Sequence, residues 1–284
     1  MKKRRYLFPR AKDYHKPGFP EVPNGLGAVY VIVSAVYLFT LHILNVEGAL
    51  ALAGCVLFSG FLGLFDDWAD LRWRYKAILP VFASIPLIAL RQGETKMATY
   101  IFGKIDFGIY YYLVIAPAIT TITTNAVNQL GGLNGLETIC PLIVMLGLMA
   151  VSPKSRVLLV IPSLTLAILA YYNYKGKIFV GNVGTFSEGT TLAAYAIIAN
   201  IEQTLVISII PYIVNSSLII LNYVIWRRKP SLKFDGEKLT STHRRSIQTL
   251  IAYRRKLTEG EIVNIITLMF IITTLTAVLI SFIS

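Results

Sequence analysis

Charge is scarce in this sequence. Aspartate, glutamate, lysine and arginine together make up 15% of the 284 residues, whereas 55% of the residues are hydrophobic. Soluble domains carry about 25% charged residues, so this composition excludes an ordinary soluble fold. The apolar residues form long blocks and the mean hydropathy is +0.62, which favours a protein that spans a membrane with helices.

Cysteine is nearly absent, which excludes a disulfide framework. Cys55 and Cys140 both lie within apolar segments, so we predict buried thiols rather than a disulfide or a metal-binding pair. The start of the chain is basic and polar and has no apolar core, so no cleavable signal peptide is visible.

The apolar blocks predict an all-α polytopic membrane helix bundle that forms a single integral membrane domain over residues 1–284. Several expected helices are shorter than the ~20 residues that cross a bilayer, so the number can change by one, and two of them, 138–151 and 189–200, are the weakest. The nine expected helices are 27–44, 48–65, 77–90, 108–124, 138–151, 156–171, 189–200, 204–225 and 262–283.

The positive charges are distributed unevenly between the two sides of this bundle. The net charge is +12, and the positive-inside rule makes the N-terminal segment 1–26 and the loop 226–261 cytoplasmic. That rule already accounts for the charge, so no nucleic-acid partner is expected, and the basic rim suits anionic lipid heads. The lysines and arginines that fall on the opposite side are Arg91, Lys96, Lys104, Lys154 and Arg156.

An adjacent pair of carboxylates, Asp66 and Asp67, follows the uncharged stretch 48–65 and precedes a basic tract. Charges of both signs at a helix end indicate a polar site rather than an ordinary anchor. The carboxylates could hold Mg²⁺, which prefers one or two carboxylates plus substrate phosphates, or accept a proton. The alternative is a helix-end anchor with internal salt bridges.

Helical spacing through this tract would place Asp66, Asp70 and Arg74 on one side. It would place Arg72 above Lys76 on another side. Like charges four residues apart repel each other, so we expect these two cations to share an anion.

Two further polar segments fall on the same predicted face. Segment 120–138 places Asn125, Asn128 and Asn134 among three glycines at a helix end. Side-chain amides supply directional donors and acceptors, and glycines let the backbone approach a ligand. The alternative is an ordinary turn with asparagine caps.

In the second segment, 171–189, Phe179 precedes a glycine turn that contains Asn182 and leads into a helix. A helix N-terminus behind such a turn is a natural seat for a phosphate or diphosphate, and the aromatic ring could stack on a base. The alternative is a capped turn between two membrane helices.

His243, Arg244 and Arg245 lie in the polar loop 226–261, which is long enough to form a small cytoplasmic lobe or lid. A guanidinium suits phosphate or sugar hydroxyls, and the histidine could be an acid, a base or a hydrogen-bond donor. The alternative is a solvated basic loop.

Taken in order, these motifs resemble those of the polyprenyl-phosphate N-acetylhexosamine-1-phosphate transferase family. AKDYHKPGFPEVPNGLG is similar to the family's opening Asp-x-x-x-Lys-Pro-x-x-Pro-Glu segment, and GLFDDWADLRWRYKAILP is similar to its paired-Asp motif. The LRWR-x-K ending resembles the eukaryotic and archaeal dolichyl-phosphate branch more than the bacterial phospho-MurNAc-pentapeptide branch. NAVNQLGGLNGLE, FVGNVGTF and the late His-Arg follow in the family's order, so the resemblance runs from about Lys12 to the C-terminus.

The resemblance implies transfer of GlcNAc-1-phosphate from UDP-GlcNAc to a dolichyl-type polyprenyl phosphate, with release of UMP. The site would lie on the cytoplasmic face of the cell membrane in a prokaryote or archaeon, or of the endoplasmic reticulum in a eukaryote. The implied cofactor is Mg²⁺, with Mn²⁺ as the alternative, held at Asn134 and Asn182. A UDP-N-acetylhexosamine, a polyprenyl phosphate and the membrane are the expected partners, and a homodimer is a further expectation.

The resemblance also assigns roles to residues. Asp66 is the candidate base for the lipid phosphate, Asp67 shapes the same site, and Lys76 contacts the donor diphosphate. Phe179 lies under the uracil. His243 and Arg244 read the sugar and the diphosphate. The other expected substrate contacts are Glu21, Asp70, Arg72, Asn125 and Asn128.

A phosphate monoester is already mostly dianionic near neutral pH, with a second pKa of ~6, so a strong base is hardly required. We therefore expect direct attack by the lipid phosphate. The sequence does not decide between this route and a covalent Asp-phosphosugar intermediate.

Two features depart from the family pattern. Asn182 stands where the family usually has a metal-binding aspartate, so with Asn134 it offers two neutral amides where Mg²⁺ prefers a carboxylate. Either Asp66 or Asp67 supplies the charge, or the diphosphate holds the metal, or metal binding is weak. The family usually has ten membrane helices, one of them before the Lys-Pro-x-x-Pro-Glu segment, so we expect that helix to be missing or the start to be internal to a longer protein.

Three functions remain open. The first is the GlcNAc-1-phosphate transferase that begins lipid-linked oligosaccharide synthesis. The second is the same chemistry with another UDP-amino sugar for a cell-surface polymer. The third is a secondary transporter for an anionic metabolite, which is disfavoured because transporters place their binding groups near the bilayer midplane and the polar groups here are expected at one face.

Overall fold

The computed structural model describes residues 7–99, 103–227 and 229–283, and it is mostly helical, with 68% of the residues in helices. The described helices are α1 (Gly27–Ile43), α2 (Ala49–Ala69), α3 (Trp73–Ile78), η1 (Leu79–Ser84), α4 (Ile85–Ala89), η2 (Tyr111–Ile115), α5 (Ala116–Gln129), α6 (Leu136–Val151), η3 (Arg156–Leu159), α7 (Val160–Tyr174), α8 (Gly181–Ile198), α9 (Glu202–Ser208), α10 (Ile210–Trp226), α11 (Ile247–Ile251) and α12 (Glu259–Ile283). This helical content agrees with the predicted fold class.

Three short antiparallel hairpins complete the described fold. They are β1 (Arg10–Lys12) with β2 (Glu21–Pro23), β3 (Lys96–Thr99) with β4 (Gly103–Asp106), and β5 (Lys233–Phe234) with β6 (Leu239–Thr240). Residues 1–6 of the predicted basic N-terminal segment and residue 228 of the predicted loop lie outside the described residues.

Proline divides two of the predicted helices. The expected helix 77–90 is divided into α3, η1 and α4, with a proline in the first turn of η1 and another in the first turn of α4. The expected helix 204–225 is divided into α9 and α10, which meet at a bend of 62°, again with a proline in the first turn of α10. Proline lacks a backbone N–H and is best accommodated in the first turn of a helix, which agrees with new helices beginning at these positions.

The predicted bounds 189–200 were wrong for the helix that the structure places there. This helix, α8, begins at Gly181, and its polar residues Ser187 and Glu188 are buried inside the bundle. The prediction began the helix at residue 189, after these polar residues, because it placed them at the membrane boundary.

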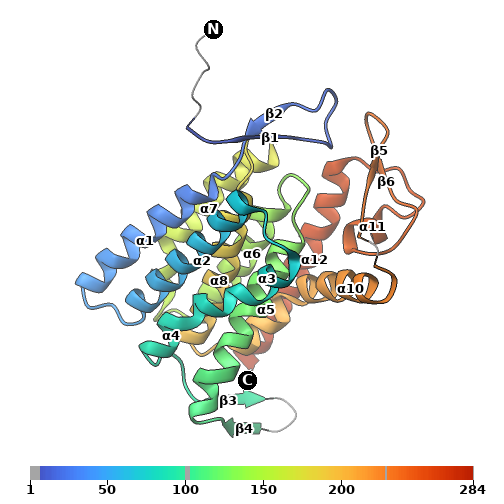
Figure 1. Ribbon diagram of the computed structural model, residues 1–284. Helices are drawn as coiled ribbons and strands as arrows, with labels where there is room; N and C mark the ends of the chain where they lie inside the picture. Colours follow the sequence, from blue (N-terminus) through green and yellow to red (C-terminus); the bar gives the residue numbers. More distant parts are fainter. Residues whose placement is uncertain (1–6, 100–102, 228, 284) are drawn as a thin grey trace.

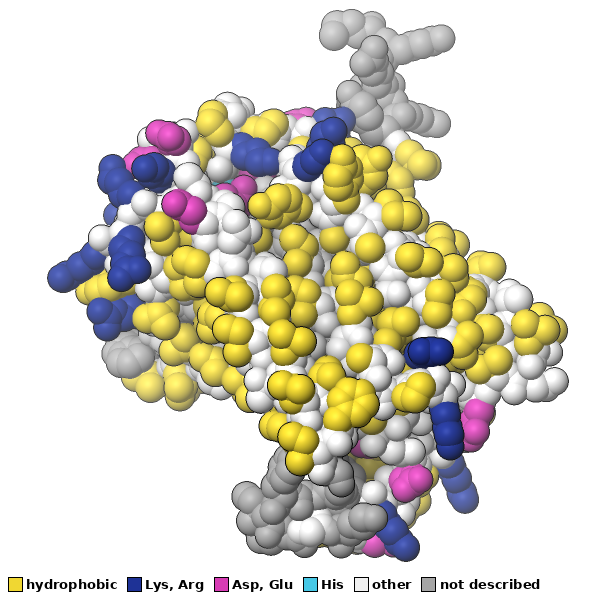
Figure 2. All heavy atoms as spheres, turned by 180° about the vertical axis from the view of Figure 1, so that it is seen from behind, with side chains coloured by type: hydrophobic (Ala, Val, Ile, Leu, Met, Phe, Trp, Pro, Cys, Tyr) yellow, Lys and Arg dark blue, Asp and Glu magenta, His cyan; other side chains and the backbone are white. Residues whose placement is uncertain are grey.

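Three described helices are long and apolar enough to cross a membrane: α2, the continuous segment Arg156–Tyr174, and α12. The bent pair α9 and α10 makes a fourth if it crosses as one broken span. Figure 2 shows hydrophobic side chains in a broad band with charged side chains gathered toward its two ends, as expected for a surface that faces lipid. These features are those of an integral membrane protein, and the nine crossings stay a prediction.

Helix α8 occupies the centre of the bundle. Every residue from Val183 to Ile197 is buried, and α1, α2, α5 and α6 pack around it. Small residues allow helices to approach closely inside a membrane. At the contact with α2, a Cβ on Gly63 would collide with the backbone of Asn182. This approach brings the end of α2, which carries the acidic pair, to the start of α8.

The hairpins mark the two ends of the molecule. In Figure 1, β1–β2 and β5–β6 lie at one end, whereas β3–β4 lies at the other, near the C-terminus. The end of the N-terminal hairpin and the residue before α1 are joined to the segment before α8 by backbone hydrogen bonds, from Phe179 N to Pro23 O at 2.8 Å and from Leu26 N to Phe179 O at 3.1 Å. The N-terminal hairpin, the long loop and the segment before α8, which the sequence assigns to the cytoplasmic side, therefore gather at one end.

Candidate functional site

A polar cavity of about 470 Å³ opens where four segments of the chain meet. Its walls come from the N-terminal segment 12–15, the end of α2, the loop between α5 and α6, and the segment from the end of α7 to the start of α8. Five of the predicted site residues line it: Asp67, Asn128, Asn134, Phe179 and Asn182.

Asp67 occupies the N-terminus of α8 with its carboxylate. Its Oδ1 accepts the backbone N–H of Asn182 at 3.0 Å, and its Oδ2 accepts that of Val183 at 3.1 Å. The first N–H groups of a helix have no partner within the helix and carry a partial positive charge, so an anion is stabilised there. The sequence predicts a phosphate seat at this helix start. In the structure the carboxylate of Asp67 accepts two of its N–H groups, and phosphate binding there stays a prediction.

Asp66 is buried and forms an ion pair with Lys76. The Nζ of Lys76 lies 2.9 Å from Oδ1 of Asp66 and 3.8 Å from Oδ1 of Asp70. The backbone N–H of Leu71 also donates to Asp66 Oδ1 at 3.1 Å, whereas Oδ2 has no hydrogen-bond partner among the described residues. The pair therefore fixes α3 against the end of α2 and leaves one acceptor atom free.

The predicted helical stacking of Asp66, Asp70 and Arg74 was wrong. Helix α2 ends at Ala69, and Asp70 adopts a left-handed backbone with φ of 44°, which aspartate tolerates better than most residues. Arg72 is extended, and α3 begins after it. Because the chain turns between the two helices, Asp70 points to solvent and Lys76 reaches Asp66. An anion shared by Arg72 and Lys76 stays a prediction.

Two of the predicted asparagines hold neighbouring elements. Asn125 donates through Nδ2 to the carbonyl oxygens of Ala77 and Thr121, each at 3.0 Å, which ties α5 to α3 outside the cavity. Asn128 lines the cavity, and its Oδ1 accepts from the hydroxyl of Thr185 at 2.7 Å, which ties α5 to α8.

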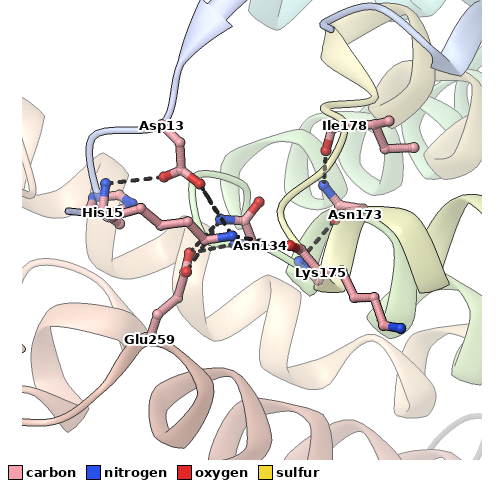
Figure 3. Close-up of polar contacts among 9 residues, drawn as sticks. Asp13, His15, Asn134, Asn173, Lys175, Ile178 and Glu259 are labelled. Atoms are coloured by element: carbon pink, nitrogen blue, oxygen red, sulfur yellow. Dashed lines mark hydrogen bonds and ion pairs between the residues drawn. The ribbon is translucent and has the colours of Figure 1, made fainter. Parts of the chain in front are cut away.

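Asn134 lies where two carboxylates converge (Figure 3). Its Nδ2 donates to Asp13 Oδ2 at 2.8 Å and to both oxygens of Glu259, at 3.0 and 3.2 Å. Its backbone N–H also donates to Glu259, at 2.8 Å. Its own Oδ1 is buried and has no partner among the described residues. A buried acceptor without a partner is uncommon and calls for a ligand or an ion.

Sequence reasoning missed several polar residues of this region. Asp13 and Glu137 line the cavity. Asn173 connects the loop before α6 to the segment before α8, because its side chain accepts from the backbone N–H of Gly135 and donates to the carbonyl oxygen of Ile178. Asp13 lies in the quoted AKDYHKPGFPEVPNGLG segment, three positions before Lys16, and that position was a usable signal. Glu259 follows a polar loop and precedes an apolar helix, where a glutamate is an ordinary first-turn residue, so its role gave no signal.

Phe179 and Asn182 frame the cavity on the side of α8. Phe179 is partly buried, and its backbone is held by the N-terminal hairpin, so an aromatic face lies beside the polar cavity. Asn182 lines the same wall next to the carboxylate of Asp67.

The predicted loop 226–261 folds into a small lobe with β5, β6 and α11. A capping box between Ser246 and Thr249 begins α11. Gln248 donates through Nε2 to the carbonyl oxygens of Leu130 and Gly131, both at 2.9 Å, so the lobe is docked on the glycine loop that forms one wall of the cavity.

The other predicted residues lie outside the cavity lining. His243 contacts Ser231 through Nε2 at 3.1 Å, and burial together with the nearby Arg245 lowers the pKa of its imidazole. Arg244 stacks on the ring of Tyr253 at 4.1 Å. Glu21 lies on β2, and Asp70 and Arg72 are exposed around the start of α3. Their assigned roles, like those of the cavity residues, stay predictions.

The donor atoms of the cavity suit a hard divalent cation. Asn134 offers a buried amide oxygen without a partner among the described residues, and Asn182 contributes a second amide to the cavity lining. Carboxylates are available from Asp13, Asp67 and Glu137 among the lining residues. Mg²⁺ binds one or two carboxylates and keeps several waters, so the residues present fit such an ion.

The fold and the site together define a helical membrane protein with a polar, carboxylate- and amide-lined cavity at one end. The chain belongs to glycosyl transferase family 4, whose family model matches residues 49–200, more than half of its length.

Relatives of this chain carry names of two kinds. It is 36% identical over 226 residues to a Saccharolobus solfataricus protein with the provisional name UDP-N-acetylglucosamine–dolichyl-phosphate N-acetylglucosaminephosphotransferase, covering 75% of this chain and 69% of the relative. It is 29% identical over 259 residues to the Dictyostelium discoideum protein of that name, covering 72% and 62%. It is 27% identical over 242 residues to a phospho-N-acetylmuramoyl-pentapeptide-transferase of Streptococcus mutans, covering 76% and 70%. The chain thus spans about two thirds of the length of these relatives.

Proposed function

We propose that this protein transfers N-acetylglucosamine-1-phosphate from UDP-N-acetylglucosamine to a dolichyl-type polyprenyl phosphate. An oxygen of the lipid phosphate attacks the sugar-bearing phosphorus of the donor, and a new P–O bond forms. The bond from that phosphorus to the bridging oxygen breaks, and UMP leaves with the electron pair. The observation that carries the proposal is the cavity that brings Asp67, Asn128 and Phe179 together in a member of this family.

The residues act mainly by positioning and by neutralising charge. The acceptor phosphate is already mostly dianionic near neutral pH, because its second pKa is ~6. Charge stabilisation and alignment supply most of the catalysis in phosphoryl transfer. Lys76 supplies positive charge beside the buried Asp66, and Phe179 offers a flat face for the uracil ring.

A divalent cation would supply charge neutralisation at the donor diphosphate. Asn134 and Asn182 would hold it through their amide oxygens, as the family resemblance implies, and Mg²⁺ is the expected ion with Mn²⁺ as the alternative. His243 and Arg244 would read the sugar and diphosphate from the docked lobe. The active end would face the cytoplasm, as the distribution of lysine and arginine supports.

A second donor is the alternative within the same chemistry. The likeness to a phospho-N-acetylmuramoyl-pentapeptide-transferase favours testing another UDP-amino sugar. Higher identity to proteins named for the dolichyl-phosphate reaction favours UDP-GlcNAc. The transporter reading stays disfavoured because the polar cavity lies beside hairpin β1–β2 at one end of the bundle rather than at its middle.

The test is release of UMP by the purified protein. UDP-GlcNAc and a dolichyl-type phosphate are supplied with Mg²⁺ or with EDTA, and UDP-MurNAc-pentapeptide is supplied in a parallel series. Release that requires UDP-GlcNAc, the lipid and the metal is the expected result. Release from UDP-MurNAc-pentapeptide alone transfers the proposal to the second donor, and no release from any UDP-amino sugar contradicts it.

A further inference from the structure

A group of side chains suited to metal binding lies at the rim of the cavity and is drawn from distant parts of the chain. Asp13, His15 and Glu259 each offer a donor atom, and these atoms lie within 4.8 Å of one another. Two atoms that bind one ion at about 2.2 Å each lie at most about 4.4 Å apart, so a shift of a few tenths of an ångström brings the three to one ion. The group connects the N-terminal segment to the first turn of α12.

Asn134 gives independent evidence for an ion at this place. The residue is 5% exposed, its amide lies between the carboxylates of Asp13 and Glu259, and its Oδ1 has no partner among the described residues. Figure 3 shows both carboxylates directed at the amide nitrogen. The amide nitrogen thus donates hydrogen bonds to two carboxylates, whereas the amide oxygen has no hydrogen-bond partner among the described residues. Rotation of the amide by half a turn presents the oxygen to the same point, where a cation would bind all three groups.

The ammonium of Lys16 lies near Asp13 but does not occupy the position between the carboxylates of Asp13 and Glu259. The Nζ of Lys16 lies 3.7 Å from Asp13 Oδ2 and donates at 3.2 Å to the carbonyl oxygen of Lys175, so it is held at the side of the group. Lys16 is partly exposed, whereas Asp13 is 2% exposed. Among the described residues, N–H groups of His15 and Asn134 donate to these two carboxylates, and the ammonium near them is that of Lys16, 3.7 Å from Asp13. Buried negative charge of this kind is stabilised further by a cation in direct contact.

The donor set indicates the class of ion. Two carboxylates and an amide oxygen are hard ligands that suit Mg²⁺ and Mn²⁺, whereas imidazole suits transition metals. A mixed set of three oxygens and one nitrogen favours a transition-metal ion such as Mn²⁺ over Mg²⁺.

We propose that Asp13, His15, Glu259 and the amide oxygen of Asn134 form a divalent-cation site that prefers Mn²⁺. The site needs no aspartate at position 182, because its charge comes from the N-terminal segment and from α12. Its use in sugar-phosphate transfer rests on the proposed function, whereas its existence does not.

The test is a Mn²⁺ titration of the full-length protein in detergent, followed by the electron paramagnetic resonance signal of free Mn²⁺. Loss of an outer partner of a metal ligand already weakens binding by about 10- to 100-fold, so Asp13→Asn and Glu259→Gln are each expected to weaken it by more than about tenfold. Glu261→Gln is the matched control, because Glu261 is exposed two residues away on the same helix and bonds only to Thr258 among the described residues. Asn182→Ala is measured beside them, because a cation site at the start of α8 would lose Mn²⁺ in that variant.

Asn134→Asp is a further variant, chosen because a gain of Mn²⁺ binding cannot be explained by failure to fold. A carboxylate at this position adds charge to the ion site and repels Asp13 and Glu259 when no ion is bound. This variant is expected to bind Mn²⁺ more tightly than wild type and to show a larger increase in thermal stability on Mn²⁺ addition. A misfolded chain cannot give that result.

The outcomes separate the site from the reaction. Unchanged Mn²⁺ affinity in both Asp13→Asn and Glu259→Gln overturns the site, as does the absence of Mn²⁺ binding by wild type. Loss of binding in Asn182→Ala alone overturns it in favour of a site at α8. Mn²⁺ binding with the expected pattern but without UMP release leaves the site standing and removes the proposed function.

Discussion

At the scale of single residues, the site is built on acids that have specific partners. Asp67 caps α8, Asp66 holds Lys76, and Asp13 meets Glu259 at Asn134. Each contact joins segments that are distant in sequence or separated by a turn. The same carboxylates that could act in chemistry therefore also hold the elements that form the cavity.

The Asp66–Lys76 pair gives a prediction about stability. Asp66 is buried, so Lys76→Met leaves an uncompensated charge and is expected to lower the free energy of unfolding by about 3 kcal/mol. Asp66→Asn combined with Lys76→Met removes both charges and is expected to recover most of the loss. The measurement is chemical unfolding of the purified protein in detergent.

The exposed pair Asp235–Lys256 provides the control for this cycle. Its atoms also lie 2.9 Å apart, but both side chains are exposed, and surface pairs contribute about 0–1 kcal/mol. Lys256→Met is expected to change the unfolding free energy little. Equal losses from Lys76→Met and Lys256→Met would show that burial of Asp66 has no energetic consequence.

At the scale of elements, prolines and small residues decide the arrangement. Prolines begin η1, α4 and α10, and the small residues of α8 let α1 and α2 pack against it closely. The lobe formed by β5, β6 and α11 buries Leu239, Ile247 and Ala252, and hydrogen bonds hold it to the glycine loop through Gln248 and to α10 through Ile247 N–H. Elements of this kind open more easily than the helical core.

Docking of the lobe through Gln248 gives the second prediction. Gln248→Ala removes two hydrogen bonds to the backbone, which contribute about 0.5–1.5 kcal/mol each. Cleavage by trypsin after the exposed Arg254 and Arg255 is expected to become about tenfold faster. The exposed lobe residue Thr242 supplies the control, Thr242→Ala. Cleavage of Gln248→Ala at the wild-type rate would mean that other contacts dock the lobe.

The sequence was sufficient for the helices and for part of the site. Long apolar blocks gave each predicted helix a helical counterpart among the described residues, and the motifs identified Asp67, Asn128 and Phe179, which line one cavity. The buried, free thiols of Cys55 and Cys140 were also predicted correctly. Helical periodicity failed at Asp70, because a left-handed residue ends α2 there, and no periodic pattern records such a turn.

The meeting of Asp13 with Glu259 could not be predicted, because it depends on tertiary packing. One residue lies beside the N-terminal hairpin and the other begins the last described helix. Neither has a local pattern that indicates a partner so far along the chain. Only the arrangement of the bundle brings them to Asn134.

At the scale of the whole molecule, the main feature is the polar end that holds the cavity. Hydrophobic side chains form a broad band on the surface, and the cavity is lined by the N-terminal segment, the glycine loop and the start of α8. The proposed transfer requires a place that both the phosphate head of a lipid and a water-soluble nucleotide sugar can reach. The central claim is that this cavity is the site of transfer.

The measurement that tests this claim most directly is UMP release by Asp67→Asn beside wild type, with both substrates and metal present. Asparagine keeps the size of the side chain but removes its charge at the N-terminus of α8. Asp106→Asn is the control, because it makes the same change at the opposite end of the molecule and keeps the acceptor for Gly108 N–H. The account predicts release by wild type and Asp106→Asn and a loss of about 100-fold or more in Asp67→Asn. Equal release by Asp67→Asn and wild type would contradict it.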